Sequence, residues 1–189
     1  MKTLALTLLT LLLAGCTASQ YDNTKPLDPS QAVIVGAVAE LFLTQPHGLE
    51  IEIQRQGEPA TRIQLTTMGN NKDIRGRNAL GEHFMYQVPP GTYEITSWRY
   101  YFYAGQSMAR RTADRFTVKA GEIAFIGNYR ANALSYCLFR TSELELAQPR
   151  LEEKFPTLKG RPIINLAAES KFEPWPTSDA RDHGKGLCK

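Results

Sequence analysis

The sequence has little excess charge of either sign, few cysteines and no long hydrophobic run. Its 189 residues carry 22 Lys and Arg against 19 Asp and Glu, a formal net charge of +3, which is too small to indicate a nucleic-acid partner. Three cysteines are too few for a disulfide-rich scaffold. No apolar run approaches the roughly 20 residues of a membrane-spanning helix. The composition, 42% hydrophobic and 22% charged, is typical of one globular domain.

Residues 1–15 have the organisation of a secretion signal. Lys2 supplies a positive start, and an apolar stretch of about ten residues follows at positions 4–13. As a helix this stretch spans roughly 15 Å, half of a bilayer core of about 30 Å, so it is expected to direct export and not to cross the membrane. An ordinary signal peptide with a chance cysteine, or a buried helix, is the alternative.

Residues 13–16, Leu-Ala-Gly-Cys, resemble the lipobox of bacterial lipoproteins. The resemblance implies cleavage before Cys16, acylation of the Cys16 thiol and a membrane anchor of several acyl chains. Thr17 stands where the usual inner-membrane retention signal has Asp, so the resemblance implies the outer membrane, with the domain facing the periplasm. Residues 16–31 are polar and contain Pro26 and Pro29, so we expect a lipidated tether that holds the domain off the bilayer.

From residue 32 onward, short runs of strand-forming residues alternate with turn residues. Leu49, Ile51 and Ile53 alternate with polar residues, the period of a half-buried strand. Residues 119–121, Lys-Ala-Gly, are expected to connect the two strands of a hairpin, 116–118 and 123–126. The pattern predicts an all-β domain over residues 32–148, an antiparallel β-sandwich of about 7–9 strands. The expected strands cover residues 33–43, 49–54, 62–66, 83–88, 92–103, 116–118, 123–126 and 134–146.

Residues 149–189 are expected to hold one short helix and an irregular tail. Pro149 at the start, Glu152 and Glu153 ahead of Lys154, and Pro156 as a stop predict a helix over residues 149–155. Prolines and glycines are frequent from residue 159 onward, and the apolar residues there follow no period.

Three short motifs resemble those of a family of uncharacterised bacterial lipoproteins. Residues 88–93 read Val-Pro-Pro-Gly-Thr-Tyr, residues 116–122 read Phe-Thr-Val-Lys-Ala-Gly-Glu, and Ile126 and Gly127 follow. The resemblance covers residues 33–130 and implies a small prealbumin-like or carboxypeptidase-regulatory-like sandwich. The family has no established chemistry, so the resemblance bears on the fold and not on the activity.

The sequence contains no enzyme signature. His47, His83 and His183 lack the spacing of metal ligands, and they are expected in a turn, at a strand edge and in the tail. Residues 105–109 lack the second glycine of a nucleophile elbow, and residues 69–81 lack the Gly-Lys-Ser/Thr of a phosphate-binding loop. We therefore expect no catalytic residue, no metal and no cofactor.

An aromatic strand is the first candidate binding surface. If Tyr93 faces the core, strict alternation places Trp98, Tyr100 and Phe102 on the outside, where they would form a platform for a sugar ring or a partner protein. The alternative is a β-bulge near residues 96–98 that reverses the faces and packs the rings in the core.

A group of arginines is the second candidate surface. Guanidinium groups suit the carboxylates and phosphates of envelope lipids and glycans. The alternative is a solvated face with local ion pairs, each worth well under about 1 kcal/mol. The group consists of Arg75, Arg77, Arg99, Arg110, Arg111 and Arg115, of which Arg75, Arg77, Arg110 and Arg111 are the candidate binding residues.

Cys137 and Cys188 remain once Cys16 is lipidated. Because unpaired thiols tend to be oxidised in the periplasm, we expect a disulfide that ties the tail to the sheet, with Phe172 and Trp175 as the tail's apolar anchors. Two separate thiols, one buried and one on a frayed end, are the alternative.

These observations together predict a non-enzymatic outer-membrane lipoprotein that binds an envelope partner, either a protein or a glycan. The membrane is a partner through the lipid anchor, and no nucleic acid is expected. A hydrolase acting on cell-wall polymers and a purely structural subunit of an envelope complex are the alternatives.

Overall fold

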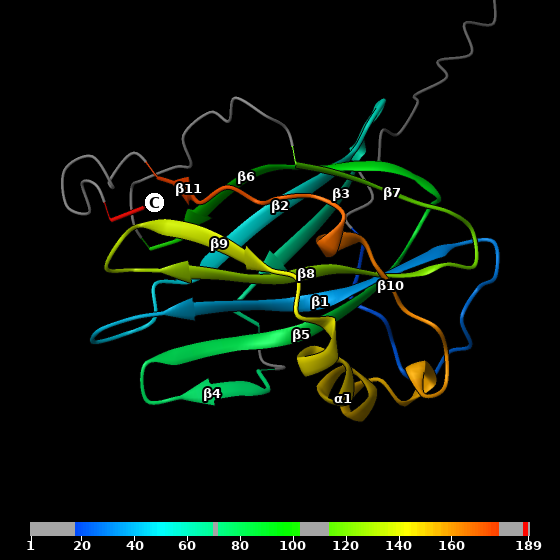
Figure 1. Ribbon diagram of the computed structural model, residues 1–189, viewed down its shortest axis with the longest axis horizontal. Helices are drawn as coiled ribbons and strands as arrows, with labels where there is room; N and C mark the ends of the chain where they lie inside the picture. Colours follow the sequence, from blue (N-terminus) through cyan, green and yellow to red (C-terminus); the bar gives the residue numbers. More distant parts are fainter. Residues whose placement is uncertain (1–17, 70–71, 103–113, 178–186, 189) are drawn as a thin grey trace, which may run out of the picture.

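The computed structural model describes residues 18–69, 72–102, 114–177 and 187–188 (Figure 1). The regular structure of this part of the chain is mainly β-strand, arranged in two sheets. The larger sheet contains, in spatial order, β11 (Trp175–Pro176), β9 (Cys137–Thr141), β8 (Ile123–Asn132), β1 (Ala32–Leu41), β5 (Ala79–Val88) and β4 (Ile74–Gly76), and β10 (Ile164–Asn165) also pairs with β8. The smaller sheet contains β3 (Glu58–Thr66), β2 (Leu49–Arg55), β6 (Gly91–Tyr100) and β7 (Asp114–Val118).

One hydrophobic cluster takes side chains from both sheets. Ile34 and Phe84 of the larger sheet and Ile51 and Tyr93 of the smaller sheet belong to it, and all four are fully buried. A core shared by the inner faces of two sheets is the arrangement of a β-sandwich. The mostly-β fold with two sheets therefore agrees with the prediction.

The larger sheet is mixed and not purely antiparallel. β1 pairs with β5 in antiparallel fashion, but it pairs with β8 in parallel, and β10 is also parallel to β8. The expected hairpin at residues 119–121 is wrong as well, because β7 pairs with β6 whereas β8 pairs with β1 and β9. That turn connects the two sheets. Alternation within a strand does not show which distant strand becomes its neighbour or in which direction.

The single α-helix of the described residues, α1 (Leu144–Lys154), covers part of the outer face of the larger sheet. It begins five residues before the predicted start, in a run that we expected to be a strand. Its buried residues, Ala147 and Leu151, are four positions apart and lie on one helix face. Leu146, which follows the period of a strand in the sequence, is 72% exposed.

The chain after α1 belongs to the same folded unit. The 3-10 helices η1 (Pro156–Leu158) and η2 (Leu166–Ala168) contribute Leu158 and Ala167 to the cluster beneath α1. In the described residues of the tail, Trp175 is 4% exposed, and Phe172 packs against the core between the sheets. These two residues anchor the tail as expected.

Cys137 and Cys188 lie at disulfide distance, with Cα atoms 5.4 Å apart across 51 residues of sequence. Cys137 is the first residue of β9 and is fully buried. The position of the pair agrees with the predicted link between the tail and the larger sheet.

Residues 18–31 pack along the domain, whereas we expected a tether. The Ala18 N–H donates to the carbonyl oxygen of Arg62 in β3 (2.9 Å), and the Tyr21 N–H donates to that of Met85 in β5 (2.8 Å). Tyr21 and Leu27 also pack against the cluster beneath α1. The segment binds mainly through its backbone to exposed strand edges, and its polar composition does not show this. No helix in the described ranges is long and apolar enough to cross a bilayer.

Candidate functional site

The aromatic strand is part of the core and does not form an exposed platform. Glu52 pairs with Ser97 and Ile53 pairs with Ile95, so Thr96 is an extra residue that forms a β-bulge in β6. The bulge reverses the faces, as the alternative interpretation requires. Consequently Trp98 and Tyr100, both 1% exposed, point into the core and their prediction as binding residues is wrong, whereas Phe102 is 70% exposed.

The candidate arginines do not form one surface in the described structure. Arg75 and Arg77 are exposed on the β4–β5 hairpin at one edge of the larger sheet. Arg99 and Arg115 lie on the smaller sheet, where each is 2.9 Å from a glutamate, Glu50 and Glu94 respectively. For Arg99 and Arg115 the alternative interpretation, a solvated face with local ion pairs, is therefore correct. Arg110 and Arg111 lie outside the described residues.

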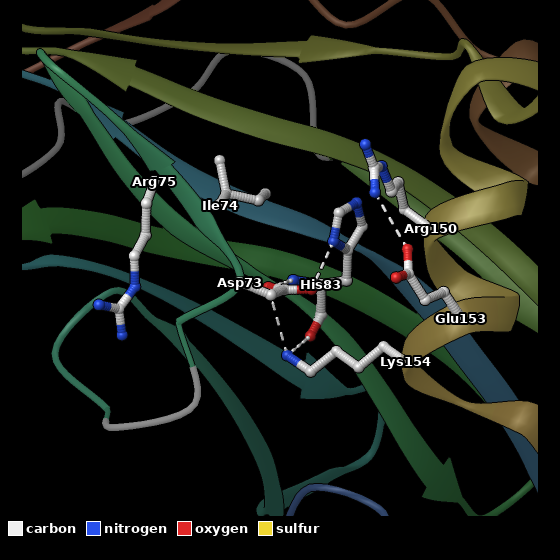
Figure 2. Close-up of a pocket in the computed structure, with 7 residues that line it drawn as sticks. All are labelled: Asp73, Ile74, Arg75, His83, Arg150, Glu153 and Lys154. Carbon is white, nitrogen blue, oxygen red and sulfur yellow. Dashed lines mark hydrogen bonds and ion pairs between the residues drawn. The ribbon is translucent and has the colours of Figure 1, made fainter.

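A different site lies beside α1 on the outer face of the larger sheet. Two pockets of about 520 and 500 Å³ share Ile74 and His83 in their walls. We call this combined feature the α1 groove, and Figure 2 shows the residues that line its first pocket. The first pocket is lined by Asp73, Ile74, Arg75, His83, Arg150, Glu153 and Lys154, and the second extends over Ala37 and Ala39 to Asn128 and Arg130.

Side-chain size along β1 explains why the groove lies there. The outward-facing Val33 and Val35 pack beneath α1 and its neighbours. The next outward positions, Ala37 and Ala39, are small and line the second pocket. The helix therefore covers the half of this face that presents large apolar side chains, and the other half stays hollow.

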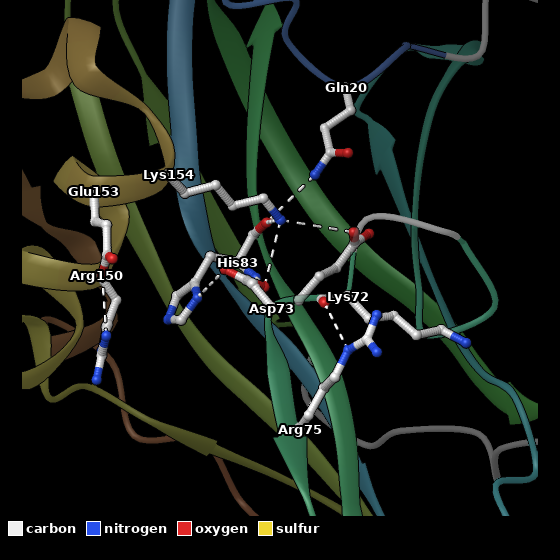
Figure 3. A network of polar contacts seen from close by, with 9 residues as sticks. Gln20, Lys72, Asp73, Arg75, His83, Arg150, Glu153 and Lys154 are labelled. Atoms are coloured by element: carbon white, nitrogen blue, oxygen red, sulfur yellow. Dashed lines mark hydrogen bonds and ion pairs between the residues drawn. The ribbon is translucent and has the colours of Figure 1, made fainter.

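His83 is the centre of a polar cluster at the end of the groove. Its Nδ1 lies 2.8 Å from Asp73 Oδ2, and its backbone N–H donates to Asp73 Oδ1, also at 2.8 Å. Lys154 Nζ donates to the carbonyl oxygen of His83 (2.6 Å) and lies 3.4 Å from Asp73 Oδ1 (Figure 3). Figure 2 shows the other ring nitrogen, Nε2, turned away from Asp73 and toward Arg150.

The environment of the cluster shifts two carboxyl groups in opposite directions. Burial acts to raise the pKa of Asp73, but the hydrogen bonds from His83 outweigh it and hold this pKa at about 2. Asp73 is therefore ionised at neutral pH and accepts hydrogen bonds from Nδ1 and from the backbone N–H of His83. Burial raises the pKa of Glu82, whose Oε2 accepts no hydrogen bond and is 3.8 Å from Lys154 Nζ.

The same residues also close an exposed strand edge. β4 pairs with β5 only along Ala79–Gly81, so the backbone of β5 from His83 onward has no strand neighbour on that side within the described chain. Asp73 accepts from the backbone N–H of His83, while Lys154 and Gln20 donate to its carbonyl oxygen. Covering an edge in this way prevents pairing with another chain. Covering the strand edge is thus a sufficient structural role for Asp73 and Lys154. It does not involve Nε2 of His83, which remains available to a ligand.

The groove can bind a ligand through charge and through hydrogen bonds, and the His83 ring is one of its polar groups. The residues that line the first pocket include no serine, threonine or cysteine that could act as a nucleophile. Within the described ranges, no group of three or more His, Cys, Asp and Glu side chains is placed to hold a metal ion.

Sequence reasoning did not find this site. The prediction of His83 at a strand edge is correct, but nothing in its spacing indicated a pocket. Asp73 precedes His83 by 10 residues, and that pair could have been noticed across the intervening turn. Lys154 lies 71 residues beyond His83, on a helix whose start was predicted wrongly, so no local pattern connects the two.

No known protein family, curated protein or solved structure matches this chain. The lipobox resemblance and the resemblance to sandwich lipoproteins therefore rest on the sequence motifs. The functional argument rests on those motifs and on the geometry of the groove.

Proposed function

We propose that this protein is a non-enzymatic outer-membrane lipoprotein whose periplasmic domain binds an envelope partner in the α1 groove. Residues 13–16 and Thr17 support the anchor and its location. The observation that carries the binding proposal is the hollow half of the outer sheet face, where a pocket over Ala37 and Ala39 adjoins a second pocket beside His83. Concave sites with a few convergent polar groups are the usual form of binding sites.

The charges of the groove favour a partner that carries carboxylates or phosphates. Arg75 lines the first pocket and Arg130 lines the second, and both are exposed. Their guanidinium groups can each hold a carboxylate with two hydrogen bonds. An acidic protein segment and an acidic glycan both have this chemistry.

We also propose that the two sheets form a β-sandwich of the prealbumin-like or carboxypeptidase-regulatory-like kind. The core shared by the sheets supports this. The cluster that α1, η1 and η2 share with the larger sheet supports a single domain that extends beyond residue 148.

Crosslinking in cells tests the binding site. A photoreactive residue in place of Ile74 or Arg130 should capture a specific envelope component, while the same residue at Thr117 on β7, outside the groove, should not. Capture from Thr117 with none from the groove positions would contradict the proposal. The same single protein captured from every exposed position would instead favour a structural subunit enclosed in a complex.

Replacement of the lipidated residue tests the anchor. Cys16→Ser removes the thiol that carries the lipid, so incorporation of labelled palmitate should be lost. Labelling that persists at the wild-type level would contradict the lipoprotein assignment.

A hydrolase is the second candidate function, and the hydrogen bond between Asp73 and His83 is the observation that favours it. A carboxylate that orients an imidazole is the arrangement of a general base, and here water would have to be the nucleophile. Purified protein should be incubated with peptidoglycan and the soluble fragments measured. Release by the wild type and not by His83→Gln would establish the hydrolase and overturn the non-enzymatic proposal.

A further inference from the structure

The first described residues bridge the edges of the two sheets. Ala18 is bound to Arg62 in β3, the edge strand of the smaller sheet, and Tyr21 is bound to Met85 in β5. Between them, Gln20 Nε2 donates to the carbonyl oxygen of His83 (3.4 Å). Residues 18–21 therefore lie across one side of the sandwich, attached to both sheets.

This attachment leaves almost no free chain before the lipidated cysteine. Cys16 precedes Ala18 by two positions, and two residues of extended chain span at most about 7 Å. A lipid on Cys16 would therefore hold the β3–β5 side close to the bilayer. A flexible linker of some fifteen residues would instead allow the domain to move on the order of 20 Å from its anchor and to rotate freely.

We propose that the β3–β5 side of the sandwich is the surface that lies against the membrane. This inference rests on the proposed lipid anchor, and the occupant of the surface is the lipid headgroup layer. Two exposed cations near residues 18–21 can exchange a weak surface ion pair for the phosphates of that layer. They are Arg62, which lies 3.8 Å from Glu52, and Lys25, which lies 3.9 Å from Asp22, with side chains 55% and 75% exposed.

The orientation has a consequence for the α1 groove. Gln20 contacts His83 directly, so the His83 end of the groove lies at the membrane-facing side. Arg130 lies on β8, two strands from β5 in the order of the larger sheet, which corresponds to about 10 Å further from that side. The groove therefore extends from the membrane surface toward the periplasm, and a partner enters it beside the lipid headgroups.

Quenching of a fluorescent label by the membrane tests the orientation. Arg62→Cys and Thr117→Cys place labels on the exposed face of the smaller sheet, on its opposite edge strands β3 and β7. Lipid blocks Cys16 and the other two cysteines pair with each other, so the introduced thiol is the one that reacts. The protein is extracted from membranes and placed in phosphatidylethanolamine–phosphatidylglycerol vesicles containing a headgroup-nitroxide lipid.

The label at position 62 should be quenched roughly threefold more than the label at position 117, because the two edges are about 14 Å apart. Equal quenching, or stronger quenching at 117, would overturn the orientation. A flexible insert of ten residues between Thr17 and Ala18 lengthens the reach by about 17 Å and should remove most of the difference. A difference that survives the insert would show that the short connection does not set the orientation.

Mass spectrometry of the same preparation separates this inference from the proposed function. Absence of the diacylglyceryl mass on Cys16 would overturn the lipoprotein assignment together with the orientation. Presence of that mass with equal quenching at the two positions would overturn the orientation alone.

Discussion

The two sheets are joined in different ways along their two sides. On one side, between β7 and β9, Arg140 and Asp114 lie 3.2 Å apart with side chains 4% and 6% exposed. On the other side, between β3 and β5, the side chains of Asp73 and Lys154 are 32% and 18% exposed. We refer to these as the Arg140 side and the His83 side.

On the Arg140 side, the polar groups are engaged with one another. The Arg140 guanidinium donates to both oxygens of Asp114, to the carbonyl oxygens of Ala167 and Ser170, and to the Ser170 hydroxyl. It also lies 5.3 Å from the ring centre of Phe172. A buried ion pair is tolerated when such bonds satisfy its charges. This side is therefore a structural closure between the tail and both sheets.

On the His83 side, polar groups are left over. Nε2 of His83 faces a pocket, and Glu82 Oε2 has no hydrogen bond. Incomplete pairing costs stability, but it leaves groups that can engage a ligand. These contacts indicate that the Arg140 side maintains the fold, and the His83 side is where we propose that binding and membrane contact occur. Four changes test this difference.

The largest effect is expected for Arg140→Ala. Removing one partner of a buried ion pair leaves the Asp114 carboxylate buried without the charge and hydrogen bonds of Arg140, so the free energy of unfolding should fall by about 3–5 kcal/mol. Urea denaturation measures it. The control is Arg150→Ala, whose side chain is 70% exposed, and a change under about 1 kcal/mol is expected there. A loss of stability in Arg140→Ala as small as that in Arg150→Ala would contradict the inference that the Arg140 side maintains the fold.

Cys188→Ser tests the tail that completes the Arg140 side. Opening a loop closed across 51 residues should cost up to about 4 kcal/mol, and less to the extent that the tail stays attached through Trp175. The unfolding midpoint should shift by the same amount when wild-type protein is reduced. Alkylation of both Cys137 and Cys188 in denatured, unreduced periplasmic protein would show that the bridge is absent.

On the His83 side, Asp73→Asn should cost only about 1 kcal/mol at neutral pH, because the carboxylate is partly exposed. The folded pKa of about 2 lies below the ordinary value of 3.8, so ionised Asp73 stabilises the fold above about pH 4. That contribution is lost as the pH falls from about 4 to 2. Acid denaturation should therefore be less steep in the variant. An unchanged acid profile would show that the hydrogen bonds to His83 contribute no stability.

The smallest effect is expected for Glu82→Gln. Burial raises the pKa of Glu82, so its charged form is costly in the folded protein and stability decreases as the pH rises through its titration. The neutral amide should be neutral or stabilising at pH 7, within about 1 kcal/mol. Thermal unfolding at pH 7 and pH 4 measures this. A clear loss of stability at pH 7 would show that the pair with Lys154 matters more than the burial.

Much of the local structure could be predicted because it depends on neighbouring residues. The alternation of Leu49, Ile51 and Ile53 locates β2 correctly, since side chains of period two face one buried side. The three residues at positions 119–121 do form a short connection after β7. The alternation of Leu144 and Leu146 was misleading, because these two residues form the first turn of α1. The helix buries Ala147 and Leu151 instead.

The candidate site could not be predicted to the same extent. The aromatic strand had two interpretations, and one extra residue, Thr96, decided between them. A bulge depends on how β6 registers with β2, which alternation within β6 does not specify.

The sequence by itself determined the class of fold and the tail residues Phe172 and Trp175 that reach the core, and it alone carries the resemblance of residues 13–16 to a lipobox. These features depend on composition and on local spacing. Only the tertiary structure decided that β1 and β8 are parallel neighbours, and that His83 meets Lys154 across 71 residues. The physical reason is that contacts between distant segments depend on which strand edges and faces remain uncovered, and this is settled only when the sheets pack together.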